Sequence, residues 1–93
     1  MASDITADCT FRTIIDGDIK CISIVTPAAA DSLDTIDLGS DTAAGAKIGT
    51  ILDTLIQDDE GADEEATWVP STGVITLGTL SSSGIHNMIV WGI

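Results

Sequence analysis

The sequence predicts a single all-β domain spanning residues 1–93, a small antiparallel β-sandwich or barrel of jelly-roll-like type. Two observations indicate this fold class. Short segments rich in Ile, Val and Thr are separated by turn residues such as Gly, Asp and Pro. Several of these segments also alternate apolar and polar side chains, which is the period of a strand with one buried face.

The first two strands are expected on either side of a tight turn. Residues 5–15 alternate apolar and polar side chains, and Asp16-Gly17-Asp18 then predicts a hairpin. Ile19 to Thr26 predicts the second strand, because β-branched residues dominate it. Pro27 ends that strand, since a proline cannot donate a hydrogen bond to a ladder.

The two cysteines, Cys9 and Cys21, are expected to be reduced. The hairpin would place Cys21 opposite Arg12 or Thr13 and leave Cys9 about 10–13 Å away. A disulfide tolerates Cα separations of only about 7 Å. Both thiols are therefore expected to act as small hydrophobic side chains.

The middle of the chain predicts a connector over 27–34, a short strand over 35–38 and a break at 39–41. Residues 46–57 suit two structures. Their apolar residues fit an amphipathic helix at spacings of three and four, whereas Ile48, Leu52 and Ile56 also alternate with threonines as in a strand. We favour the strand, because Gly45 and Gly49 disfavour a helix.

The last third of the chain predicts strands that are separated by loops. Residues 58–65 form an acidic loop with six carboxylates, followed by strands over 67–69 and 74–77 that flank a turn at 70–73. Residues 78–84 predict a loop of small residues, and Ile85 to Trp91 a closing strand. In that strand the apolar residues of one parity are Ile85, Ile89, Trp91 and Ile93.

Carboxylates recur along the chain, but they match no cation-binding motif. The acidic loop could offer oxygen ligands to Ca²⁺ from Asp58, Asp59 and Asp63, yet its order and spacing differ from those of an EF-hand. A solvated loop is the simpler interpretation. A second acidic series is expected to cap turns and comprises Asp31, Asp34, Asp37 and Asp41.

Nothing in the sequence specifies a reaction or a cofactor. His86 is the only histidine, and with either cysteine it would form a nucleophile–base pair, but no nucleophile motif surrounds these residues. We expect His86 to face solvent or a neighbouring chain. Two cysteines and one histidine, unclustered, make no zinc site.

The charge of the chain indicates the salt conditions and the classes of partner that suit it. Fifteen carboxylates against three basic residues give a net charge of −12, although 44% of the residues are hydrophobic. This combination predicts a folded domain with an acidic surface, of the kind that stays soluble in concentrated salt. Such a surface disfavours nucleic acids and anionic lipids as partners.

Subunit contact is expected for a chain this small and this poor in aromatic residues. Trp is common in interface centres, because it buries a large area and retains one hydrogen-bond donor. The candidate interface residues are Trp91, Ile93, Trp68 and Met1, with residues 1–4 as an N-terminal arm. Core packing is the alternative for both tryptophans.

Three phrases resemble small β proteins of tailed viruses. These are Asp34-Thr35-Ile36-Asp37-Leu38, Thr72-Gly73-Val74-Ile75-Thr76-Leu77 and the closing segment His86 to Gly92, similar to the "GDTID", "TGVITL" and "xxVxG" phrases of short structural or decoration proteins. Leu33 departs from the first phrase, which has a glycine at that position. The resemblance covers roughly residues 31–93.

The resemblance implies a non-enzymatic virion protein that binds the major capsid shell and copies of itself, as a trimer, pentamer or hexamer. Such a protein is made in the host cytoplasm, and the acidic composition suggests a haloarchaeal host. Two alternatives stay open. One is a tail, baseplate or vertex turret component, and the other is a small ligand- or cation-binding β module.

Overall fold

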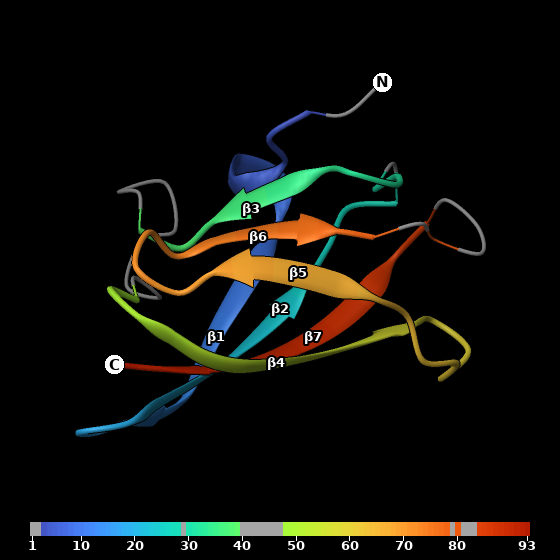
Figure 1. Ribbon diagram of the computed structural model, residues 1–93. Helices are drawn as coiled ribbons and strands as arrows, with labels where there is room; N and C mark the ends of the chain where they lie inside the picture. Colours follow the sequence, from blue (N-terminus) through green and yellow to red (C-terminus); the bar gives the residue numbers. More distant parts are fainter. Residues whose placement is uncertain (1–2, 29, 40–47, 79, 81–83) are drawn as a thin grey trace.

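The computed structural model describes residues 3–28, 30–39, 48–78, 80 and 84–93 (Figure 1). A short 3-10 turn, η1 (Thr6–Asp8), precedes the strands in the described residues. These are β1 (Thr10–Asp16), β2 (Lys20–Val25), β3 (Thr35–Asp37), β4 (Ile51–Asp58), β5 (Ala66–Val69), β6 (Val74–Leu77) and β7 (His86–Gly92).

The strands form two antiparallel sheets that pack as a sandwich, which confirms the all-β prediction (Figure 1). One sheet has the order β1-β2-β7-β4 and the other the order β3-β6-β5. The chain passes from one sheet to the other after β2, β3, β4 and β6. The described residues thus form seven strands, one fewer than the eight of a jelly roll.

The core lies between the two sheets and is almost entirely aliphatic. Alternate residues of each strand point inward, so the core collects side chains from both sheets and from the segments that connect them. Its largest fully buried aliphatic members are Ile22, Ile24, Ile36, Leu38, Ile48, Ile51, Ile75, Leu77 and Val90. Phe11 and Trp68 pack against this cluster from its rim.

The β1–β2 hairpin forms as predicted, but its register differs from the expected one. Asp16 pairs with Lys20, which leaves a three-residue loop, and the register shifts between Thr13 and Ile15. Cys21 therefore lies opposite Ile15, and the prediction that it faces Arg12 or Thr13 is wrong. Both cysteines are free thiols, as expected.

Residues 5–9 do not belong to the first strand, contrary to the prediction. Residues 6–8 form η1, and the carboxylate of Asp4 accepts hydrogen bonds from the backbone N–H, at 2.9 Å, and the hydroxyl of Thr6 at its start. The Thr6 hydroxyl in turn accepts the backbone N–H of Asp37 at 2.8 Å. Thr6 thereby attaches the start of the chain to β3.

Within the segment with two interpretations, residues 51–57 lie in a strand, as we favoured, whereas residues 48–50 precede it outside any strand. β4 pairs with β7, and its register shifts between Ile51 and Asp53, so Leu52 is an extra residue in a bulge. Leu52 is consequently exposed, although simple alternation had placed it with Ile56. Residues 46 and 47 lie outside the described residues.

Aspartates cap the turns before and after β3, as predicted. Asp34 is buried, and its two carboxylate oxygens accept the backbone N–H groups of Ser3 and Asp31, each at 2.9 Å. Asp37 accepts the N–H of Gly39 at 2.9 Å. Asp41 lies outside the described residues.

The closing strand turns an unexpected face to the core. Met88 and Val90 are buried, whereas Ile85 and Ile93, of the other parity, are 40% and 53% exposed. His86 shares the buried parity and is only 1% exposed, so the prediction that it faces solvent or a neighbouring chain is wrong. Both parities of β7 carry large apolar residues, so the alternation did not say which one is buried.

Leu33 has a left-handed backbone, with φ of +68°. This region disfavours a side chain with a Cβ by about 1–2 kcal/mol and suits glycine. The Leu33 side chain is 57% exposed, so little packing compensates for the strain.

We predict that Leu33→Gly stabilises the protein by up to about 1 kcal/mol. The relief of strain outweighs the larger conformational entropy that glycine gives to the unfolded chain. Leu33→Ala is the matched control, because it removes the side chain but keeps the strain, and it should leave the free energy of unfolding nearly unchanged. Denaturant titration measures all three proteins. Equal stability of Leu33→Gly and Leu33→Ala would contradict the account.

Candidate functional site

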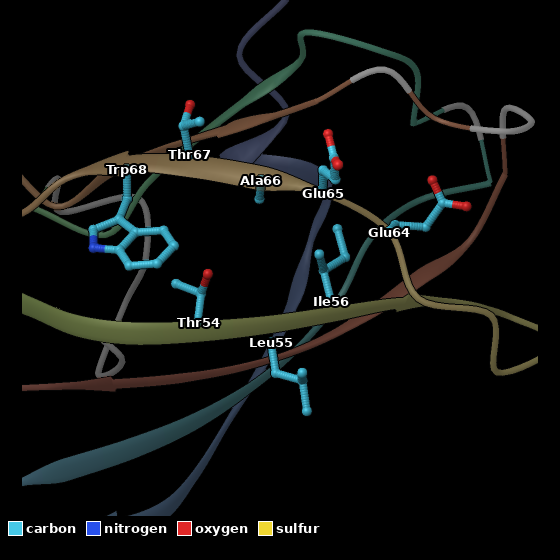
Figure 2. Close-up of a pocket in the computed structure, with 8 residues that line it drawn as sticks. All are labelled: Thr54, Leu55, Ile56, Glu64, Glu65, Ala66, Thr67 and Trp68. Carbon is cyan, nitrogen blue, oxygen red and sulfur yellow. The ribbon is translucent and has the colours of Figure 1, made fainter.

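The outer face of the four-stranded sheet is the side that points away from β3, β5 and β6. In β2, Ile22 and Ile24 point into the core, so Cys21 and Val25 belong to the outer face. In β4, Thr54 and Ile56 point toward β5 while Leu55 points away from it (Figure 2). No strand of the other sheet covers this face (Figure 1).

Register places the outward side chains of the four strands in rows. The first row runs across β1, β2, β7 and β4 as Ile15, Cys21, Trp91 and Asp53. The second row is Arg12, Ser23, Ile89 and Leu55. The third row is Thr10, Val25, Asn87 and Gln57. Ile93 follows Trp91 with the same parity.

Half of the side chains in these rows are apolar, which is unusual for the solvent side of a sandwich. We define the outer patch as the apolar residues Ile15, Cys21, Val25, Leu55, Ile89, Trp91 and Ile93. Ile15, Leu55 and Ile93 are 55%, 51% and 53% exposed. Cys21 is buried between its register partners Ile15 and Trp91. An exposed apolar patch on a soluble domain marks an interaction surface.

Charge is nearly absent from the outer face. Of the twelve side chains in the three rows, only Arg12 and Asp53 are charged, and their charges cancel. The chain as a whole carries −12. Arg12 lies on the β1 edge of the sheet and Asp53 on the β4 edge, so the two charges stand at opposite sides of the patch.

A groove opens where the edges of the two sheets diverge, between β4 and β5. Its volume is about 400 Å³. Trp68 reaches from β5 toward Thr54 and Ile56 of β4, and Glu64 and Glu65 stand at the other end (Figure 2). The backbone N–H of Glu64 donates to the carbonyl of Ile56 at 3.1 Å and joins the strands there.

The weak calcium candidates use their oxygens within their own loop. Asp58 closes β4, and its Oδ1 accepts the backbone N–H groups of Glu60 and Ala62 at 2.9 and 2.8 Å. Oδ1 of Asp63 accepts the side-chain amide of Gln57 at 3.3 Å. Among the residues that the structure describes, no three His, Cys, Asp or Glu side chains gather as metal ligands would. The loop, including Asp59, is held by its own turn.

The thiols and the histidine do not form a nucleophile–base pair. Cys21 belongs to the outer face, whereas His86 points into the core from the same sheet. Burial raises the pKa of Cys9 to about 12, with a smaller contribution from the charges of Asp8 and Asp4, so this thiol stays protonated near neutral pH. Nδ1 of His86 lies 2.8 Å from the Gly84 carbonyl and therefore carries the proton. Its buried Nε2 has no hydrogen-bond partner.

The interface residues named from the sequence fall in different places. Trp91 and Ile93 belong to the outer patch, whereas Trp68 lies in the groove and Met1 outside the described residues. Ser3 and Asp4 of the expected arm bind Asp34 and Thr6 of their own chain.

Sequence reasoning missed Ile15, Val25, Leu55 and Ile89 as members of the patch. The available signal was that β4 and β7 carry large apolar residues at both parities, so that one sheet face alone would not bury them all.

Comparison with protein-family models, with characterised proteins and with solved structures returns no match. The part of the chain that the structure describes contains no helix with the length and apolar character that crossing a bilayer requires. The interpretation of function therefore depends on the surface chemistry of the chain and on the three sequence phrases.

The raised pKa of Cys9 predicts a loss of stability in alkali. Below about pH 9 the thiol is protonated in both the folded and the unfolded chain, so it does not make the free energy of unfolding depend on pH. Between about pH 9 and 12 it ionises only in the unfolded chain, which favours unfolding. The free energy of unfolding should thus fall more steeply from pH 9 to 11 in the natural protein than in Cys9→Ala, as measured by urea titration at each pH. Parallel pH profiles would contradict the assignment.

Proposed function

We propose that this chain is a non-enzymatic structural protein of a halophilic tailed virus, a decoration or minor capsid protein that binds the major capsid shell as an oligomer. One observation carries the proposal. A chain of net charge −12 leaves an apolar, electrically neutral sheet face exposed, and a neighbouring subunit of a particle would bury it. The viral phrases within residues 31–93 point to the same class of protein.

The left-handed backbone at Leu33 supports the likeness to the viral phrases. The "GDTID" phrase has glycine there, and this chain bends at the same place with φ of +68° although it carries leucine. The first two phrases contain β3 and β6, and these two strands are neighbours in the three-stranded sheet. The third phrase is β7 in the other sheet, so the phrases contribute strands to both layers of the sandwich.

Adhesion through apolar contact suits a particle in brine. The range of electrostatic interactions falls to about 3 Å at about 1 M salt, so repulsion between acidic subunits becomes short-ranged there. Exposed ion pairs lose most of their effect under the same conditions. Burial of apolar side chains, by contrast, is not weakened by salt. The outer patch is thus the part of the surface best suited to hold a subunit in place.

One observation favours the alternative of a small ligand-binding module. The groove between β4 and β5 has a volume of about 400 Å³ and is lined by the Trp68 indole at one end and by Glu64 and Glu65 at the other, with the carboxylate of Glu65 pointing away from β4 (Figure 2). Aromatic and acidic side chains together suit a small organic cation. The groove is open along the seam between the sheets, whereas ligand pockets enclose most of their ligand. A tail, baseplate or turret subunit would use the outer patch as a capsid protein does.

We predict that the protein co-sediments with shells assembled from the major capsid protein of the same genome, in about 2 M salt. Leu55→Asp places a carboxylate in the outer patch and should weaken this binding at least about tenfold, because a buried unpaired charge costs several kcal/mol. Sedimentation through a density gradient, with quantification of both proteins in each fraction, measures the binding.

Val69→Asp is the matched control for this experiment. Val69 is 50% exposed on β5 of the other sheet, so the variant adds the same charge to an equally exposed strand position. It should bind shells as the natural protein does. Shell binding that is absent in the natural protein, or equally reduced by both substitutions, would overturn the proposed function.

A further inference from the structure

We propose that the outer face of the four-stranded sheet pairs with the same face of a second copy of this chain, with β1 of each copy over β4 of the other. The inference rests on the proposed function and names which neighbour covers the outer patch. Three properties of the face carry it: the scarcity of charge on it, the placement of its charged side chains, and its size.

Because the outer face carries almost no net charge, a second copy of this highly acidic chain can approach it. A second copy brings another −12 of charge, and any contact between acidic surfaces would bring carboxylates together. In the three rows only Asp53 is acidic, and Arg12 balances it. Asp63, whose backbone bridges to Gln57 and whose Oδ1 accepts the Gln57 side-chain amide at 3.3 Å, adds one carboxylate at the β4 edge of the third row. Two copies that meet through their outer faces therefore place few carboxylates in the contact, and Asp63 stands on the same edge as Asp53.

The placement of the two charges makes the face complementary to itself. Sheet order puts Arg12 on the β1 edge and Asp53 on the β4 edge. A two-fold axis parallel to the strands, between two stacked sheets, places the β1 edge of one copy over the β4 edge of the other. Arg12 then lies within one row of Asp53 of the second copy, about 7 Å along the strand, which an arginine side chain can span. Symmetry produces the same pair twice.

The area of the outer face limits how tightly two copies can bind. Four strands about 4.8 Å apart and six residues at about 3.3 Å each give a face of about 19 by 20 Å. Two copies would bury on the order of 800 Å² together, which is below the roughly 1,200–2,000 Å² of stable specific complexes and within the range of weak, transient ones. We therefore expect a reversible dimer with a Kd in the micromolar range or weaker. A two-fold contact closes at two copies, so the trimer or pentamer implied by the viral resemblance would require a second surface.

Sedimentation equilibrium of the isolated chain tests the pairing without any capsid protein. In about 1 M salt, at concentrations up to the millimolar range, the natural protein should form a dimer, because screening weakens overall repulsion while a partly buried pair is screened less. Leu55→Asp should shift the Kd upward at least about tenfold, and Val69→Asp should leave it unchanged. A natural protein that stays monomeric, or equal effects of both variants, would overturn the proposal.

Exchanging the charges of Arg12 and Asp53 tests whether β1 of one copy lies over β4 of the other. Asp53→Arg reduces the net negative charge of the chain, so overall repulsion between copies falls. It should nevertheless weaken the dimer, because two arginines then face each other. Arg12→Asp should also weaken it, and the double variant Arg12→Asp/Asp53→Arg should recover most of the natural affinity. A tighter dimer for Asp53→Arg, or no recovery in the double variant, would contradict the arrangement. Circular dichroism and urea unfolding confirm that each variant is folded.

The outcomes separate this inference from the proposed function. A chain that binds shells but never dimerises would refute the second copy as the partner and leave the virion role standing. A chain that dimerises through the outer face but ignores shells would refute the virion role and leave the pairing standing.

Discussion

The packing of aliphatic side chains between the two sheets is the interaction on which the rest of the structure depends. With three aromatic residues in the chain, the core consists of Ile, Leu, Val and Met side chains from alternate strand positions. Fourteen of the fifteen carboxylates belong to described residues, and Asp34 is the only one among them that is buried. It remains there because backbone N–H groups satisfy both of its oxygens.

The choice of inward parity in β7 determines the chemistry of the outer face. Met88 and Val90 occupy the core, so Ile89 and Trp91 lie on the other side of the sheet. Cys21 of β2 and Leu55 of β4 flank them in register. The outer patch is thus a consequence of strands that are apolar on both faces, in a protein whose second sheet covers only one. That surplus of apolar surface is the physical basis of the adhesive role that we propose.

Alternation and turn residues were sufficient to predict most strands, because those signals are local. The hairpin at Asp16-Gly17-Asp18, the strand after residue 50 and the pair around Pro70 all follow from them. The η1 turn was not predictable from alternation, since the hydrogen bonds of Thr6 to Asp4 and Asp37 do not show in the apolar pattern. The register of Cys21 depended on a bulge that shifts the pairing by one residue. The outer patch draws on four strands between residues 10 and 92, so only the sheet order reveals it.

The most direct test of the account is the free energy of unfolding of the natural protein in urea as the salt concentration rises. An acidic coat that repels itself around an aliphatic core should give a stability that rises steeply as KCl is raised from about 0.1 M to about 1 M, where the screening length reaches about 3 Å. The dilute protein, below the concentration at which it associates, isolates this effect from dimer formation. A free energy of unfolding that is flat or falls over that range would contradict the proposal that the protein is adapted to concentrated salt.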